Sequence, residues 1–259
     1  MKRKIKPKKK IKLVAKPLSE VELRFAQAWA GSKSSKSNFG ANFRPTPEEV
    51  REQMKVVAFH EAAHVVARFF SAIDAGHTES VSIIPGGGSL GREVFSTSFA
   101  TAGWSPKHAV WQLAVGRALL LQILAGRGAE YLICTKGRPE PVYNPRAFDL
   151  IFIGTDLSEA QDLAKRMAMP GLSSHRILKE AAKWTLKMLK IPVVWSAVKR
   201  LAQLLLERGE VNDFDLILST CREVFCLVLR RNSPQWKRYL FLRKCDEEAK
   251  FGPSQRQDG

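Results

Sequence analysis

Two histidines and a glutamate within five consecutive positions carry the clearest chemical signal in this sequence. The segment reads His60-Glu61-Ala62-Ala63-His64. On an α-helix, residues four apart lie one above the other on the same face, so both imidazoles can reach one metal ion. Glu61 lies about 100° around the helix from His60, where its carboxylate can accept a proton from water at the metal. The spacing therefore predicts a zinc-binding helix with Glu61 as the general base.

The chemistry of zinc explains why these residue types occur at this spacing. Zinc binds neutral imidazole nitrogens and carboxylate oxygens, and a catalytic zinc site has three protein ligands and a fourth position for water. At such a site the pKa of water falls to about 7, which provides a nucleophile at neutral pH. We therefore expect one zinc ion per chain, held by His60, His64 and a third ligand.

Spacing alone does not identify the third ligand. The candidates are the remaining histidines and three later carboxylates: His77, His108, His175, Glu130, Asp149 and Asp156. Asp156 opens an amphipathic segment, and its local pattern favours a helix N-cap, with Glu159 as the capping-box partner, over a metal ligand. Glu130 lies near the end of a helix that begins after Ser105-Pro106, where it could be a ligand or could form a helix-end salt bridge.

The helix that carries the motif has clear start signals. Thr46 is expected to be its N-cap, Pro47 suits the first helical position, and Glu49 completes a capping box with Thr46. Apolar residues flank the motif on both sides, so we expect this helix, near 47–73, to lie in the core. Further helices are expected near 106–133, 156–168, 174–190, 193–208 and 213–231, with a short one at 18–30.

One β-hairpin interrupts the helical pattern. Its strands are expected at Val81–Ile84 and Leu90–Phe95, joined by a turn at Pro85-Gly86-Gly87-Gly88. The predicted fold is therefore mainly α, in the α+β class, with one small β-hairpin.

Charge divides the chain into three parts. The net charge is +17, and residues 1–16 contain many lysines and no acid. Such dense like charge opposes folding, so we expect 1–45 to be a largely disordered basic tail, 46–228 to be the folded domain of about 180 residues, and 229–259 to be a basic extension. Basic segments interleaved with aromatic residues suit nucleic acids, although a solvated tail and an ordinary amphipathic helix explain them as well.

The four cysteines have no C-x-x-C spacing, no secretory signal is evident and no long apolar run is present. Together these features predict reduced thiols, no transmembrane segment and a cytoplasmic location.

Five motifs, in order along the chain, resemble the peptidase domain of the FtsH-type ATP-dependent zinc metalloproteases. Residues 60–64 (HEAAH) resemble that family's HEAGH, and 81–91 (VSIIPGGGSLG) resemble its V-T-I-I-P-x-G-x-x-L-G hairpin. Residues 125–130 (AGRGAE) resemble its G-G-R-A-A-E helix, and 154–167 resemble its S-N-D-[IL]-x-x-A-T-x-x-A-R-x-M segment. Residues 202–208 (AQLLLER) resemble its late A-x-x-L-L-E-x helix. Departures are Ala63 and Gly86, where the family usually has Gly and Arg, and an apparent insertion over 135–153.

This resemblance implies a helical, zincin-like metallopeptidase. It implies that Asp156 is the third zinc ligand and that Glu130 is a helix residue near the site. It also implies an edge strand beside the metal helix, at Val81, Ser82, Ile83 and Ile84, that holds extended or unfolded polypeptide by main-chain hydrogen bonds. The expected activity is that of a zinc metalloendopeptidase.

Members of that family carry membrane segments and an AAA+ ATPase module ahead of the peptidase domain. Only about 45 residues precede the metal helix here, so we expect ATP-driven unfolding, where it occurs, to come from a separate AAA+ protein. Oligomers are compatible with the sequence. The alternative function is a non-proteolytic protein of the same fold that binds zinc or is tethered to nucleic acid by its basic tails.

Overall fold

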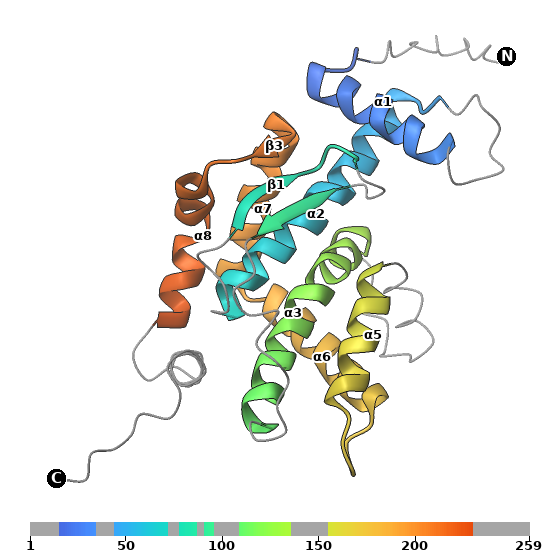
Figure 1. Cartoon of the computed structure of the whole chain (residues 1–259). Coiled ribbons are helices and arrows are strands. Elements are labelled where there is room, and N and C mark those ends of the chain that lie inside the picture. The colour runs from blue at the N-terminus through green and yellow to red at the C-terminus, as the bar shows by residue number, and fades with distance from the viewer. Residues whose placement is uncertain are drawn as a thin grey trace, which may run out of the picture.

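The computed structural model describes residues 16–34, 44–71, 78–86, 91–95, 109–135 and 155–229. Over these ranges the fold is mainly helical, as the sequence predicted, with a small three-stranded sheet (Figure 1). The helices are α1 Glu20–Ser34, α2 Pro47–Ser71, α3 Ala109–Cys134, α5 Thr155–Met167, α6 Ser174–Leu189, α7 Pro192–Arg208 and α8 Phe214–Leu229.

Helix α2 is the central element of the fold. It packs against α3, α7 and α8, and the sheet also contacts it. Its apolar residues are almost all buried, including Val50, Ala58 and Val66. A second, smaller hydrophobic cluster joins α3 to α5 and α6. Helix α3 contacts α2 on one side and α5 and α6 on the other. It therefore connects α2 to α5, the helix that contains Asp156.

The capping box predicted at the start of α2 is present. The Thr46 backbone N–H donates to Glu49 Oε2 at 2.8 Å, and the Glu49 N–H donates to Thr46 Oγ1 at 3.3 Å. These bonds satisfy two backbone donors that have no partner within the helix. The cap therefore fixes where α2 begins, nearly four turns before the first histidine.

The short helix expected near 18–30 is present as α1, but its packing differs from the expectation of a largely disordered tail over 1–45. Helix α1 has its own capping box, in which Ser19 and Glu22 exchange hydrogen bonds of 2.6 and 3.3 Å. Phe25 is fully buried and Trp29 nearly so, both in the core around α2, and Arg51 of α2 pairs with Glu22 at 2.9 Å. Residues 20–34 thus belong to the folded domain, which begins earlier than the expected boundary.

The sheet has the order β2-β1-β3, with β1 Thr78–Ser82, β2 Arg92–Phe95 and β3 Glu210–Val211. The expected antiparallel hairpin is present, and Val81 lies opposite Glu93. Val81 also lies opposite Val211 of β3, and the Ile83 N–H donates to Gly209 O at 2.9 Å. The expectation that Val81, Ser82, Ile83 and Ile84 form an edge strand is therefore wrong, because β1 is the central strand and β2 is an edge.

The cap on α2 leads to a stability prediction. Thr46→Ala removes the acceptor of the Glu49 N–H and should lower the free energy of unfolding by about 1 kcal/mol, measured by urea denaturation. Thr46→Ser keeps the hydroxyl that accepts from the Glu49 N–H and donates to its carboxylate, and it should stay close to wild type. Equal losses in both variants would show that the cap does not stabilise α2.

Candidate metal centre

Two turns of α2 and the first turn of α5 bring three metal-binding side chains together. His60 Nε2 and His64 Nε2 lie 2.9 Å apart, and Asp156 Oδ2 lies 3.2 Å from the first and 3.7 Å from the second. One donor atom from each residue falls within 4.8 Å of the others. In the described part of the chain, no other group of three histidine, cysteine or carboxylate side chains has this arrangement.

The opposite nitrogen of each imidazole has a defined partner. His60 Nδ1 lies 2.7 Å from Glu130 Oε1, and His64 Nδ1 lies 2.7 Å from the backbone carbonyl oxygen of Gln122. A carbonyl or carboxylate oxygen only accepts hydrogen bonds, so each Nδ1 carries the hydrogen. In the neutral rings, both Nε2 atoms then present lone pairs. Such outer partners fix the tautomer and orientation of histidines that bind metals.

Three lone-pair-bearing atoms thus converge on one position. Asp156 Oδ2 is buried and has no well-aligned hydrogen-bond donor among the described residues. Placing two imidazole lone pairs and a carboxylate oxygen this close is unfavourable unless a cation lies among them. The arrangement therefore fits a metal ion bound by His60, His64 and Asp156.

The pKa values of His60, His64 and Asp156 also indicate that positive charge is stabilised at this position. Burial disfavours a charged imidazole, but the carboxylates of Asp156, Glu130 and Glu61 outweigh burial and raise the pKa of His60 to about 10. Burial likewise opposes a charged His64, yet Asp156 raises its pKa as well. Burial would raise the pKa of Asp156, but the two imidazoles hold it well below its usual range. A proton binds this position strongly, and a metal ion competes with it.

Glu130 is a positioning residue on the far side of the His60 ring. Burial would raise its pKa, but His60 and Arg127 lower it, and Arg127 Nη1 lies 2.8 Å from Glu130 Oε2. The ionised carboxylate therefore holds the Nδ1 hydrogen of His60. Because Glu130 contacts Nδ1 and Asp156 faces Nε2, the geometry favours Asp156 over Glu130 as the third ligand.

A glycine on α3 provides the space for the two rings. A Cβ at Gly126 would lie 2.5 Å from His64 Nε2 and 2.6 Å from His60 Nε2. Any side chain there would occupy the position at which the donor atoms meet. Since glycine in a helix interior costs about 1 kcal/mol relative to alanine, its presence in α3 is best explained by this close approach.

Glu61 lies beside the centre and next to the sheet. It is buried, with an exposed fraction of 7%, and a Cβ at Gly91 would lie 2.5 Å from its Oε1. Its negative charge contributes to the raised pKa of both histidines. The predicted general base is therefore close to the three donor atoms and to the residue that immediately precedes β2.

The other sequence candidates are not part of this group. His175 is exposed near the start of α6. His77, His108 and Asp149 lie outside the described residues. Sequence reasoning missed the Gln122 carbonyl, Arg127 and the role of Gly126. The three glycines of this helix, Gly116, Gly126 and Gly128, and the resemblance at 125–130 were the available signals for Gly126.

A scan against models of protein families finds no match to this chain. A search of curated proteins also finds no significant match. The metal centre is therefore inferred from the geometry of its residues. None of the helices in the described part of the chain combines the length and apolar character needed to span a bilayer.

Gly126→Ala tests the close packing of the centre. The substitution favours the helix, but its methyl group displaces at least one imidazole, so zinc affinity should fall at least about tenfold while the helix content is kept. Competition with a chromophoric chelator measures the affinity. Gly31→Ala is the matched control, since a Cβ there meets nothing within 4 Å. Unchanged affinity in Gly126→Ala would contradict this geometry.

The raised histidine pKa values predict how metal binding at this centre depends on pH, with zinc as the test ion. Because the pKa of His60 is about 10 without metal, zinc must displace a proton throughout the neutral range. Apparent zinc affinity should therefore increase as the pH rises from about 6 to 8, about tenfold per pH unit for each proton released. Calorimetry in buffers of different ionisation enthalpy measures this release. Affinity independent of pH would contradict the assignment.

Proposed function

We propose that this protein is a zinc-dependent metalloendopeptidase. The observation that carries the proposal is the combination of three convergent donor atoms with a buried carboxylate, Glu61, beside them. A purely structural zinc site is closed by four protein ligands and needs no adjacent base. Three ligands with a base are typical of hydrolytic zinc sites.

Each residue has a distinct task in this reaction. His60, His64 and Asp156 hold the metal, and Glu130 fixes the His60 ring through its Nδ1 hydrogen. When bound, zinc supplies the positive charge that acidifies water and polarises the substrate carbonyl. Glu61 accepts a proton from the attacking water at a carboxylate oxygen and transfers it to the amine nitrogen of the cleaved bond.

The substrate is proposed to bind along β2 rather than β1. Strand β1 already pairs on both sides, whereas the order β2-β1-β3 leaves the outer edge of β2 without a strand among the described residues. Gly91, directly before β2, lies against Glu61. An extended polypeptide that pairs with β2 would therefore bring a peptide bond close to the base. Main-chain pairing accepts many side chains, so unfolded polypeptides are the proposed substrates.

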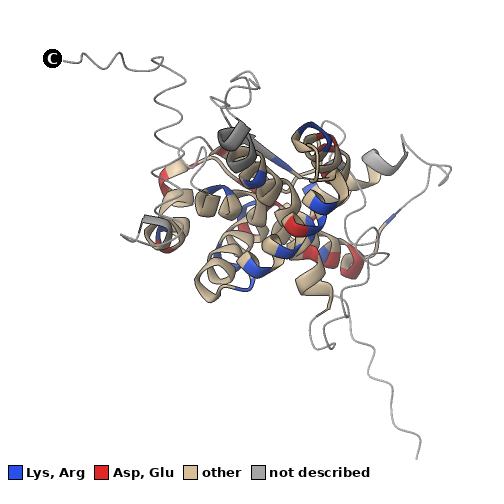
Figure 2. Cartoon of the chain, turned by 90° about the horizontal axis from the view of Figure 1, so that it is seen from below, with Lys and Arg blue, Asp and Glu red and all other residues tan. Residues whose placement is uncertain are grey.

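Two further partners are proposed, a separate AAA+ ATPase and nucleic acid. The resemblance to FtsH-type peptidase domains suggests a separate AAA+ ATPase that unfolds substrates. On the face seen in Figure 2, basic and acidic residues are both distributed over several helices of the described part. Nucleic-acid binding would therefore depend on the basic segments at 1–15 and 230–259, which lie outside the described residues.

Glu61→Gln separates catalysis from metal binding. The amide keeps the size of the side chain but cannot accept the proton, so hydrolysis of unfolded casein should fall at least about a hundredfold. Zinc content, measured by atomic absorption, should stay near one ion per chain. Glu52→Gln, at an exposed position on the same helix, should behave like wild type.

Two results would contradict the proposal. Equal hydrolysis by Glu61→Gln and wild type would assign the cleavage to another site or a contaminant. Zinc binding by a wild-type protein that does not cleave unfolded polypeptides would favour the alternative, a non-proteolytic zinc protein on this fold.

A further inference from the structure

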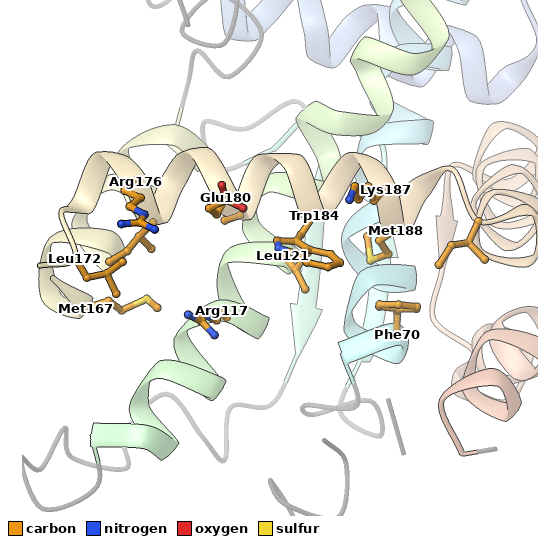
Figure 3. Close-up of a pocket in the computed structure, with 13 residues that line it drawn as sticks. Phe70, Arg117, Leu121, Met167, Leu172, Arg176, Glu180, Trp184, Lys187 and Met188 are labelled. Carbon is orange, nitrogen blue, oxygen red and sulfur yellow. The ribbon is translucent and has the colours of Figure 1, made fainter. Parts of the chain in front are cut away.

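A pocket of about 770 Å³ lies apart from the metal centre. Its walls come from α3 and α6, and the C-terminal ends of α2 and α5 contribute Phe70 and Met167 (Figure 3). Neither the proposed metal ligands nor Glu61 line it. Its volume is in the range of pockets that hold small organic ligands.

Most of the pocket surface is apolar. The side chains that provide this surface include Phe70, Leu121, Met167, Leu172, Trp184 and Met188. Trp184 is 58% exposed, and an exposed apolar side chain that adjoins other apolar side chains in a pocket is typical of ligand-binding grooves. Two methionines add flexible side chains that can adapt to an apolar ligand.

The charged residues of the pocket are mostly basic. Arg117, Arg176 and Lys187 line it, against one acid, Glu180. Lys187 Nζ lies 4.9 Å from the centre of the Trp184 ring. Within the described part of the chain, Arg117 and Arg176 form no ion pair with a carboxylate. Two guanidinium groups in one pocket, neither neutralised there, favour a ligand with an acidic group.

The two arginines of the pocket lie toward one end, and Lys187 lies near Met188 at the other (Figure 3). Arg176 lies at one end with Met167 and Leu172, and Arg117 lies toward the same end (Figure 3). Met188 and Phe70 lie at the other end, with Trp184 between. Two guanidinium groups toward one end, with Leu121, Trp184, Met188 and Phe70 beyond them, match a ligand that has an acidic group at one end and an elongated apolar part.

We propose that this pocket binds free fatty acids, with the carboxylate near Arg117 and Arg176 and the hydrocarbon chain along Leu121, Trp184, Met188 and Phe70. The inference goes beyond peptide hydrolysis and does not depend on it, since no residue is shared with the metal centre. Charge complementarity selects a carboxylate over a neutral or cationic amphiphile. Glu180 is exposed and reduces, but does not cancel, the positive charge of three cations.

Equilibrium dialysis of the full chain with radiolabelled dodecanoate, below its micelle concentration, tests the proposal. Saturable binding of one dodecanoate per chain is expected. Dodecylammonium, which has the same tail and the opposite charge, should bind at least about tenfold more weakly. Octanoate should also bind at least about tenfold more weakly, because four fewer methylene groups are buried.

Substitutions of exposed residues locate the site without disturbing the core. The double variant Arg117→Gln, Arg176→Gln should weaken dodecanoate binding at least about tenfold. Lys183→Gln is the matched control, since Lys183 is exposed on α6 but does not line the pocket, and it should bind like wild type. Glu61→Gln should also bind like wild type.

Three outcomes would overturn the proposal. They are no saturable binding, equal affinity for dodecanoate and dodecylammonium, and unchanged affinity in the double arginine variant. Equal affinity for the two amphiphiles would show only nonspecific hydrophobic adsorption. Zinc content and casein hydrolysis of the double variant are measured in parallel, so a failure of the fatty-acid site is distinguished from a failure of the peptidase proposal.

Discussion

The convergence of two imidazole nitrogens and a carboxylate oxygen on one position is the constraint on which the account depends. The hydrogen bonds of His60 to Glu130 and of His64 to the Gln122 carbonyl orient both lone pairs toward that position. Bringing such atoms together is unfavourable without a cation, and the raised pKa of His60 indicates that a proton supplies this positive charge when no metal is bound. A metal ion that replaces this proton binds the folded state only, and it should therefore stabilise the fold.

The surrounding helices meet this constraint through rigid packing. Helix α2 carries both histidines, and its packing against α3, α7 and α8 fixes its position in the core. Helix α3 contributes Glu130, the Gln122 carbonyl and the space at Gly126, so it serves the site without a metal ligand of its own. Helix α5 then needs to place only Asp156, in its first turn, and the small cluster of α3, α5 and α6 fixes its position.

Local patterns in the sequence predicted much of the fold and part of the site. The helix spans, the capping box at Thr46 and the pair His60 and His64 are short-range features, and a single sequence shows them. The central position of β1 could not be predicted, because β3 has only two residues and no strand pattern. The buried packing of α1 was also missed, although Ser19 and Glu22 form a capping box, because the surrounding lysines suggested disorder.

The third ligand illustrates the limit of sequence reasoning most clearly. Local pattern favoured an N-cap at Asp156, and only resemblance to a family favoured a ligand. The structure brings Asp156 to the histidines across nearly a hundred residues of chain, a tertiary contact that spacing does not encode. The Gln122 carbonyl could not be predicted at all, since every residue has such a group and only the fold selects one.

X-ray absorption spectroscopy at the zinc edge of the zinc-loaded protein tests the central claim most directly. The account predicts a low-coordinate shell of nitrogen and oxygen at about 2.0–2.1 Å, with the multiple scattering of two imidazoles and no sulfur. His64→Ala should reduce that scattering to one imidazole. A shell of oxygen ligands without imidazole, or one that contains cysteine sulfur, would contradict the account.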